Sequence, residues 1–542
     1  MPRDDRIAES TPFPYGSAGA VTCVSAQKGK NGGVRAPGAH ASTIPTVGAS
    51  SSEVALSELA RDVQGGTLYG DALVSGISYD SRKVLDGSLF FALPGSRTDG
   101  HDHARAAVEA GATALVVERP LGLEVAQLVV PSVRAAIGPM SAAFYGRPSS
   151  QLAVAAVTGT NGKTTTCAVL RHCLNAAGIP AGQVGTVGSH YLGRSLGTSL
   201  TTPQAPDLQW ILHQMVRAGV RAVAMEASSH GLDQRRMDGI SVDVGVFMNL
   251  TREHLDYHGS MEGYLEAKSR LFEPTRCRAA LVCTDDDWGR RLVGRLEIPV
   301  TTFGHGADAD VPYAVEERGL GGIVVELAGP EERVRLSSPL VGQVNGANVT
   351  AAYLAARALG LSQDQVVAAI AGASAPPGRF ELVGDGSPFL VVVDYAHTPD
   401  ALAALIATAR GISSGRVSVV LGARGGRDKG KRPETGRVAA TADRVFLTTD
   451  SPGDEPIAEI IRALYRGTLE AHSRSDVVVE PDRRAAIERA VDESSPGDVV
   501  LIVGRGHEQF QHIGSETVQL DDRVAAREAL AARGAQPGVV CG

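Results

Sequence analysis

The chain has 542 residues, of which 43% are hydrophobic and 21% charged, a balance that is typical of globular domains. Its formal net charge of −8 offers no general attraction to nucleic acid or anionic lipid, and its aromatic content of 4% disfavours stacking platforms for single-stranded nucleic acid. We therefore expect no nucleic-acid partner. The chain contains no run of about 18 apolar residues, so we also expect no membrane span. It has no CxxC pair of the kind found in zinc and redox sites, and we expect it to be located in the cytoplasm.

The composition changes near residue 52. Residues 1–51 are rich in Gly, Ala, Ser, Thr and Pro without periodicity, which predicts a disordered extension, or a stretch upstream of the natural translation start. Residues 52–150 alternate strand and helix patterns and predict a small α/β domain. The polar segment 78–82 between its apolar runs is typical of a capped turn. The expected strands are 88–93 and 114–117, with a helix over 102–110 between them.

The most informative stretch begins at residue 153. Residues 153–157 form an apolar run short enough for a buried strand, a turn beginning at Gly159 follows, and residues 164–177 have a helical pattern. The N–H groups of such a turn, the helix dipole and the ammonium of Lys163 together form a phosphate site, and Thr164 is placed to bind Mg²⁺. The loop is shorter than the usual Walker A loop, which disfavours ordinary GTPases and ATPases.

Two more strands of a central domain, residues 151–378, end in polar side chains. The strand predicted over 220–225 leads to Glu226, and the strand predicted over 242–248 leads to the segment containing His254. Ligands of open α/β sheets lie outside the carboxyl ends of the strands. We therefore expect Lys163, Glu226 and His254 to face one pocket, with Glu226 well placed for Mg²⁺.

Several positions in the central domain leave alternatives open. Glu226 by itself could form a surface salt bridge, and the spacing of His254 and His258 would suit zinc on a helix, although loop residues around them favour a role near Mg²⁺. Lys268 lies in a predicted apolar helix, where a lysine usually snorkels to solvent. Asn345 could cap the helix that follows it.

The last domain, residues 379–542, alternates strands and helices clearly and predicts a Rossmann-like sheet. Its strand ends carry Asp394, Asp450, the basic cluster 427–432 and the segment 504–508. The basic cluster could be only a solvated loop, but its place at a strand end beside the others favours anion binding. The expected strands are 389–394, 417–421, 444–448 and 499–503, and the expected helices are 399–410, 455–470 and 483–492.

Four segments together resemble the Mur ligase family: 158–165 (TGTNGKTT), 225–232 (MEASSHGL), 394–399 (DYAHTP) and 504–508 (GRGHE). The resemblance extends from about residue 52 to the C-terminus. It implies an α/β protein of three domains: a small N-terminal UDP-binding domain (52–150), a central P-loop ATPase-like domain (151–378) and a C-terminal Rossmann-like domain (379–542) that binds the amino acid and closes over the site.

The resemblance also implies roles for individual residues. Those implied to bind ATP are Gly159, Thr160, Asn161, Gly162, Lys163, Thr164, Thr165, Asn345, Arg379 and Asp394. Those implied to bind the UDP-muramyl dipeptide are Ser81, Thr201, Thr202, Ser228, Gln234 and Arg236. Those implied to bind the amino acid are Arg427, Asp450, Gly504 and Glu508. The implied catalytic residues are Lys163, Glu226, His254 and Lys268, and Mg²⁺ would be held by Thr164, Glu226, His254 and a carbamylated Lys268.

The implied activity is that of an ATP-dependent amide ligase in cell-wall synthesis, and the implied cofactors are ATP and Mg²⁺. Such an enzyme adds a free diamino acid to UDP-N-acetylmuramoyl-L-alanyl-D-glutamate through an acyl phosphate, and we expect it to act as a monomer. The two alternatives are a folylpolyglutamate-synthase-like ligase and a P-loop ATPase that acts as a conformational switch.

One segment departs from the family pattern. Members that add diaminopimelate have Asp-Asn-Pro-Arg, where the arginine grips the distal carboxylate, whereas this chain has Asp450-Ser451-Pro452-Gly453. The guanidinium that would pair with that carboxylate is missing, and the acids Asp454 and Glu455 follow. From this segment we expect L-lysine or ornithine rather than meso-diaminopimelate.

Overall fold

The structure is a computed structural model that describes residues 53–95, 98–197, 200–328, 333–384, 386–471 and 474–535. The extension predicted to be disordered, residues 1–51, lies outside the described residues. Within the described ranges, none of the helices combines the length and the apolar character that crossing a membrane requires.

The N-terminal region contains a five-stranded sheet that is parallel except for its edge strand β2. Its strands in spatial order are β2 (Thr67–Tyr69), β7 (Ala126–Val129), β6 (Ala112–Val117), β5 (Ser88–Phe91) and β4 (Gly76–Ser78). The helix expected over 102–110 begins as a 3-10 turn, Gly100–His103, and continues as α2, Ala104–Glu109. The first turn differs because the Asp99 side chain accepts a hydrogen bond from the His101 N–H and caps it.

Small elements complete this region. The β1 strand (Val54–Ala55) pairs with β3 (Leu73–Val74). The short helix α1 (Leu56–Leu59) directly follows β1 in the chain. The capped turn predicted over residues 78–82 is confirmed. The Asp80 carboxylate accepts a hydrogen bond from the Arg82 N–H at the start of a 3-10 turn. The longer helix α3 (Val133–Phe144) leads to the central sheet.

The central sheet has eleven strands with β8 (Ala153–Thr158) near its middle, between β12 (Ala222–Glu226) and β13 (Val242–Phe247). Successive residues of β8 contribute to two different cores, since Val154 and Ala156 pack on one face and Ala155 and Val157 on the other. A strand buried on both faces reads as a continuous apolar run rather than an alternating one. The predictions of these three strands are therefore confirmed.

Parallel strands extend the sheet beyond β13, and antiparallel hairpins flank it at both edges. The hairpin strands were not predicted from the sequence. The remaining strands are β9 (Ala181–Gly185), β10 (Gly188–Tyr191), β11 (Arg194–Leu196), β14 (Cys277–Cys283), β15 (Val300–Gly304), β16 (Val311–Glu317), β17 (Ile323–Ala328) and β18 (Arg333–Ser338).

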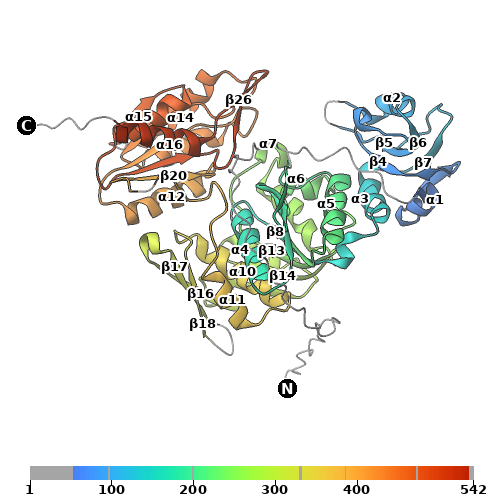
Figure 1. Cartoon of the computed structure of the whole chain (residues 1–542), viewed down its shortest axis with the longest axis horizontal. Helices are drawn as coiled ribbons and strands as arrows, with labels where there is room; N and C mark the ends of the chain where they lie inside the picture. Colours follow the sequence, from blue (N-terminus) through green and yellow to red (C-terminus); the bar gives the residue numbers. More distant parts are fainter. Residues whose placement is uncertain are drawn as a thin grey trace, which may run out of the picture. The chain divides into compact units, whose positions relative to one another are not determined.

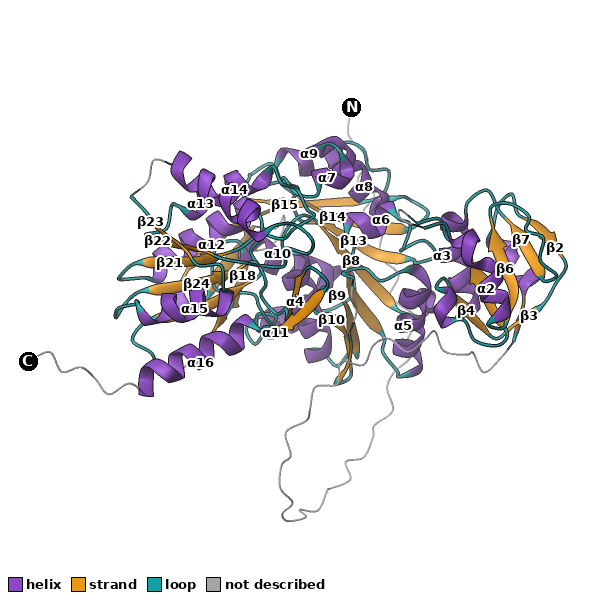
Figure 2. Ribbon diagram, turned by 90° about the horizontal axis from the view of Figure 1, so that it is seen from above, coloured by secondary structure: helices purple, strands orange, loops and turns teal. Residues whose placement is uncertain are grey.

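Helices cover both faces of this sheet, as Figure 2 shows from above. On one face α4 (Lys163–Ala176) packs against α10 (Asn345–Ala358) and α11 (Gln363–Ile370), and on the other face α3 packs against α5 (Ala205–Arg217). The shorter helices are α6 (Ser229–Asp233), α7 (Leu255–His258), α8 (Met261–Ser269) and α9 (Asp287–Val293).

The C-terminal region is a further α/β unit with helices on both faces of a six-stranded sheet, drawn in orange and red in Figure 1. Its sheet is parallel except for β19. The strands in spatial order are β19 (Glu381–Leu382), β20 (Leu390–Asp394), β24 (Val499–Val503), β21 (Val417–Leu421), β22 (Arg444–Leu447) and β23 (Asp476–Val479). The predicted Rossmann-like sheet is confirmed.

Five helices flank these strands. The helix expected from residue 455 starts two residues later because Pro456 stands at its N-cap position. The helices are α12 (Pro399–Ile412), α13 (Lys431–Ala439), α14 (Ile457–Glu470), α15 (Arg483–Asp492) and α16 (Asp522–Ala535), and a ribbon of β25 (Phe510–Ile513) and β26 (Glu516–Gln519) precedes α16.

Candidate functional site

The turn after β8 has a backbone that requires glycine at two positions. Gly159 and Gly162 have φ of 146° and 89°, conformations that other residues rarely adopt. A Cβ at Gly159 would lie 2.9 Å from the Cβ of Met248, and a Cβ at Gly162 would lie 2.4 Å from Asn348 Oδ1. Asn249 fixes the turn, because its side-chain oxygen accepts the Asn161 N–H at 2.9 Å. The turn therefore places its N–H groups at the start of α4.

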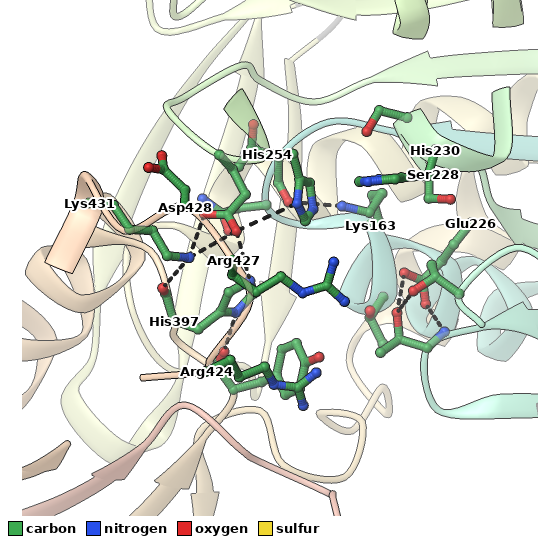
Figure 3. Close-up of a pocket in the computed structure, with 18 of the residues that line it drawn as sticks. Lys163, Glu226, Ser228, His230, His254, His397, Arg424, Arg427, Asp428 and Lys431 are labelled. Atoms are coloured by element: carbon green, nitrogen blue, oxygen red, sulfur yellow. Dashed lines mark hydrogen bonds and ion pairs between the residues drawn. The ribbon is translucent and has the colours of Figure 1, made fainter. Parts of the chain in front are cut away.

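A cavity of about 590 Å³ opens at this turn. It is lined by eight lysine and arginine residues and five aspartate and glutamate residues, so it carries an excess of positive charge in a chain that is negative as a whole. The basic residues are Lys163, Arg236, Lys268, Arg379, Arg424, Arg427, Lys431 and Arg432, and the acidic residues are Glu226, Glu253, Asp428, Asp450 and Glu508. A cleft with this balance attracts anions locally, and Figure 3 shows residues from several separate segments pointing into it.

Lys163 bends back over the turn. Its ammonium donates to the carbonyl oxygens of Gly159 and Thr160, both at 2.8 Å. Burial lowers the pKa of Lys163, whereas the negative charge of Glu226 raises it. The two carbonyls thus hold the Lys163 amine at the mouth of the phosphate loop. A bound anion would take their place as the hydrogen-bond acceptor of this amine.

Lys268 does not snorkel to solvent, so that alternative is excluded. Its side chain is 1% exposed, its amine donates to the Gly159 carbonyl at 2.8 Å, and it lies 4.5 Å from the centre of the Tyr264 ring. Burial and the nearby charge of Lys163 lower the pKa of Lys268 well below its usual value. Helical spacing could not reveal this, because the partner of Lys268 is a turn more than one hundred residues earlier.

Glu226 lies at the end of β12 and is 1% exposed, which rules out the alternative of a surface salt bridge. Its two carboxylate oxygens accept hydrogen bonds from the N–H and the hydroxyl of Thr186, at 2.8 and 3.0 Å. The Thr186 hydroxyl is in turn 3.0 Å from that of Thr201. The carboxylate lines the cavity in the orientation that this pair of hydrogen bonds fixes.

Histidine and tyrosine rings gather on the other side of the cavity. The His254 ring lies 4.6 Å from the His230 ring, and His258 bonds the Ser229 hydroxyl at 2.9 Å. Burial, aided by nearby positive charges, lowers the pKa of His254 to about 2, so its imidazole is neutral at physiological pH. His254 precedes α7 in a left-handed conformation, so His254 and His258 do not share the helical geometry on which the zinc alternative depended.

The residues implied to hold the dipeptide divide into two sets. Thr201, Ser228 and Arg236 line the cavity, whereas Thr202 and Gln234 lie behind them. Thr202 accepts the Ser228 N–H at 3.0 Å, and its carbonyl accepts a hydrogen bond from Arg236 at 2.9 Å. Gln234 accepts a second hydrogen bond from Arg236 at 2.6 Å. Thr202 and Gln234 therefore do not line the cavity themselves, but they orient Ser228 and Arg236, which do. Ser81 lies in the N-terminal region, outside this cavity.

The residues implied to bind the nucleotide also occupy different positions. Arg379 lines the cavity, and its guanidinium donates to the Thr164 hydroxyl at 3.3 Å and lies 4.7 Å from the Tyr395 ring centre. Asp394 is held by the N–H groups of two neighbouring loops, and burial raises its pKa. Asn345 is the first residue of α10 and donates to the Val341 carbonyl, which excludes the alternative that it caps this helix.

On the C-terminal side, Arg424 forms an ion pair with Glu508 and lies 4.0 Å from Asp450. All three line the cavity, as does Arg427, which is exposed. Gly504 does not line it, but an added Cβ there would lie 3.0 Å from Asp450, so the glycine permits a close approach of the two strand ends. The predicted residues Arg427, Asp450 and Glu508 are therefore together, and Arg424 is an additional member that the sequence did not single out.

A buried ion pair that the sequence analysis did not predict joins the two sides of the cavity. Lys431, at the start of α13, donates to both carboxylate oxygens of Glu253 at 2.9 and 2.8 Å, and both side chains are at most 10% exposed. The two residues are 178 positions apart. Glu253 directly precedes His254 and Lys431 belongs to the basic cluster, but no local pattern connects them.

Beside this pair, Glu455 holds the basic cluster. It bonds Arg432 at 2.7 and 2.9 Å, which lowers the pKa of Glu455 to about 2. A lowered pKa contributes stability that is present above the ordinary value of 4.5 and is lost as pH falls toward 2. We expect Glu455→Gln to lower the free energy of unfolding by about 3 kcal/mol at pH 7, because buried Arg432 loses its partner. Urea unfolding followed by circular dichroism measures this difference.

The pH dependence distinguishes this contribution from general damage. The difference between the wild type and Glu455→Gln should shrink as pH falls from 4.5 toward 3. Glu459→Gln, at an exposed position in the first turn of the following helix α14, is the matched control and should change stability by less than about 0.5 kcal/mol. A difference for Glu455→Gln that stays constant across this pH range would contradict the assignment.

Comparison with known proteins gives consistent matches along most of the chain. Residues 73–145 match the description "Mur ligase family, catalytic domain", residues 157–356 match "Mur ligase middle domain", and residues 378–506 match "Mur ligase, glutamate ligase domain". These three segments contain the turn after β8, the end of β12 and the strand ends that line the cavity.

Three relatives extend this result. The chain is 42% identical over 84% of its length to 93% of a protein of Solibacter usitatus, and 41% identical over 86% of its length to 96% of a protein of Geobacillus kaustophilus. A solved structure is 32% identical, with a TM-score of 0.61, over 85% of this chain and 96% of that chain. Each is named UDP-N-acetylmuramoyl-L-alanyl-D-glutamate--2,6-diaminopimelate ligase.

These names, which give 2,6-diaminopimelate as the amino acid of the relatives, disagree with the expectation of L-lysine or ornithine. That expectation depended on one segment, 450–453, in which a glycine replaces an arginine. In the structure Gly453 does not line the cavity, whereas Arg424 and Arg427 do. A missing guanidinium at one position therefore does not leave the cavity without partners for a carboxylate. The relatives also favour the Mur ligase interpretation over a folylpolyglutamate-synthase-like ligase.

Proposed function

Since this chain belongs to the Mur ligase family, we propose that it joins 2,6-diaminopimelate to UDP-N-acetylmuramoyl-L-alanyl-D-glutamate with ATP, a step of peptidoglycan synthesis. The observation that carries the proposal is one cationic cavity lined by the phosphate loop, by Ser228 and Arg236, and by Arg424 and Glu508. We infer that sites for ATP, for the acid and for the amine would meet there. We further propose that the domains divide near residues 150 and 378.

The side chains of the cavity can divide the work among three substrates. Lys163 and Arg379, beside the phosphate loop, would face the triphosphate, and Arg236 would face the carboxylate of the muramyl dipeptide. Asp450 and Glu508 are anions that would accept the ammonium of the incoming amino acid, while Arg424 and Arg427 would pair with its carboxylates. Ser81 would contact the UDP portion from the N-terminal region.

The reaction then has two steps. The γ-phosphoryl group of ATP is transferred to the substrate carboxylate, which produces an acyl phosphate and ADP and replaces a poor leaving group with a good one. The amine attacks the carbonyl carbon, a C–N bond forms, the C–O bond to phosphate breaks, and the amine loses a proton. Lys163 would neutralise charge on the transferred phosphoryl group, and enclosure of the cavity would protect the acyl phosphate from water.

Magnesium fits the oxygen donors at the phosphate loop. The Thr164 hydroxyl and the buried Glu226 carboxylate both line the cavity, and neutral His254 offers a nitrogen. Within the described residues no three metal-ligating side chains form a complete site, so nucleotide phosphates would complete the shell, as is common for Mg²⁺. When bound, the ion supplies charge neutralisation at the phosphates.

We also propose that Lys268 carries a carbamate. In this reaction the neutral amine attacks carbon dioxide, an N–C bond forms and the amine releases a proton. Burial and the charge of Lys163 lower the pKa of Lys268, which favours the neutral amine. We expect protein equilibrated with carbon-13 bicarbonate to show one carbamate carbon signal by NMR. The signal should be absent in Lys268→Arg and unchanged in Lys83→Arg, and equal signals in both variants would contradict the proposal.

Product mass tests the function. The purified protein is incubated with ATP, Mg²⁺, UDP-N-acetylmuramoyl-L-alanyl-D-glutamate and an equimolar mixture of 2,6-diaminopimelate, L-lysine and L-ornithine. The expected product has the mass of the diaminopimelate adduct and forms only when all substrates are present. ATP hydrolysis that is indifferent to the acid and the amines would instead favour a conformational switch, and a lysine or ornithine adduct would refute the amino acid proposed.

A further inference from the structure

A second cavity, of about 580 Å³, lies apart from the one described above. Three segments form it: the C-terminal half of α4, the β9–β10 hairpin with the turn to β11, and residues 374–377. Its size is within the range of pockets that bind small molecules, about 300–1,000 Å³. None of its lining residues belongs to the cavity at the phosphate loop.

The lining of this cavity contains no acidic residue. It contains two arginines and two histidines, namely Arg171, His172, His190 and Arg194. Arg171 and His172 follow Ala168 at helical spacing on α4, so they lie on the same face of that helix, and Arg194 comes from β11 opposite Tyr191. A concave site with positive charge and no carboxylate favours an anion.

Two polar groups at this cavity have no partner in the described protein. Gln183 is 1% exposed, and its Nε2 makes no hydrogen bond; the Nε of Arg171 is also buried without a partner. Buried donors normally find an acceptor, because leaving one unsatisfied costs about 1–3 kcal/mol. Gln183 lies directly opposite His190 in the β9–β10 register, so both side chains project from the same face of the sheet.

Other polar groups in the cavity are already engaged. Asn175 donates to the carbonyls of Arg171 and Ala181 and accepts the Ala181 N–H, so it holds α4 to the start of β9. His190 is 2.7 Å from the Val187 carbonyl through its Nε2. The donors available to a ligand include the guanidinium groups of Arg171 and Arg194 and the amide of Gln183.

We propose that this cavity binds a small phosphorylated molecule, whose phosphate is held by Arg171, Arg194 and Gln183. A phosphate group has several acceptor oxygens and pairs with guanidinium groups in a bidentate manner, which suits a site with more donors than one carboxylate could satisfy. The other lining residues include Tyr191 and Pro376, which would contact the rest of the molecule.

The position of the cavity allows a bound ligand to affect the catalytic site through the chain segment that connects the two. Residues 374–377 line the cavity, and Arg379, two positions further along, lines the catalytic cavity and bonds Thr164. A ligand that contacts this short connection alters the freedom of the residues that follow it, and binding at one site then changes the rate at the other. The effect on rate depends on the proposed ligase function, whereas the binding itself does not.

Calorimetric titration with pyrophosphate tests the proposal. The protein is first saturated with a non-hydrolysable ATP analogue and Mg²⁺, which fills the phosphate loop. We expect pyrophosphate still to bind, and Arg171→Gln and Gln183→Leu each to weaken this binding by roughly tenfold or more. Arg217→Gln, an exposed arginine on α5, is the matched control and should bind as the wild type does.

Two outcomes would overturn the proposal. One is the absence of pyrophosphate binding once the analogue fills the phosphate loop, which would leave the cavity with water only. The other is equal binding by the wild type, Arg171→Gln and Gln183→Leu, which would place the anion elsewhere. Thermal melting of each variant confirms that it is folded, and because Gln183→Leu removes no charge, its loss of binding would separate a built site from general electrostatic attraction.

Discussion

Replacing Lys163 with alanine should lower the ligation rate by on the order of 10³-fold, because the charge on the transferred phosphoryl group would lose a fixed cation. The amine lies at the mouth of the phosphate loop, held by the carbonyls of Gly159 and Thr160. Burial lowers its pKa, so the folded protein maintains this charge at a cost that the anionic substrate would offset. Initial rates of product formation under saturating substrates measure the effect.

The variant should remain folded, since removal of a desolvated ammonium costs little or stabilises the fold. Arg335→Ala, an exposed cation on β18 outside the cavity, is the matched control and should retain the wild-type rate. A Lys163→Ala variant that melts as the wild type does and keeps more than about one tenth of its rate would contradict the assignment of the phosphate loop.

The largest effect on stability should follow from Asp522→Ala. Arg483 and Asp522 are both 0% exposed and form two hydrogen bonds, at 2.9 and 2.7 Å, and Arg505 lies 3.6 Å from the same carboxylate. Removing the carboxylate leaves two buried guanidinium groups without their counter-ion. We expect the free energy of unfolding to fall by about 3–5 kcal/mol, measured by denaturant unfolding.

An exposed ion pair between the same two helices is the control. Arg484 pairs with Glu528 across α15 and α16, with both side chains more than 40% exposed, and Glu528→Ala should cost no more than about 1 kcal/mol. Since Arg505 lies within the segment 504–508, Asp522→Ala should also raise the KM for the amino acid through displacement of Glu508. Equal stability of the two variants would show that the buried network contributes no more than a surface pair.

Much of the fold could be predicted because its central strands are continuous apolar runs. β8, β13, β21 and β24 are buried on both faces, and that burial leaves a continuous pattern in the sequence. The hairpin strands at the sheet edges could not be predicted in this way. β16 and β18, for example, are partly exposed and contain several charged residues, so their pairing depends on neighbours rather than on their own pattern.

The candidate site could be predicted where a residue lies at the end of a core strand or just after it, as Glu226 and Asp450 do. The errors arose where the partner is distant. Lys268 has the spacing of a snorkelling lysine, yet its amine reaches the turn after β8. The pair of Lys431 and Glu253 joins segments 178 positions apart, and neither residue has a local signature. The expected amino acid disagrees with the names of the relatives, because a single segment was used to represent a cavity lined from several strand ends.

The transfer of oxygen from the acid to phosphate tests the proposed reaction most directly. UDP-N-acetylmuramoyl-L-alanyl-D-glutamate labelled with oxygen-18 in its reacting carboxylate is incubated with ATP, Mg²⁺ and 2,6-diaminopimelate. An acyl phosphate intermediate requires one labelled oxygen in each phosphate released, because the C–O bond breaks when the amine attacks. Phosphate without label, or release of phosphate at the same rate without the amino acid, would contradict the ligase account.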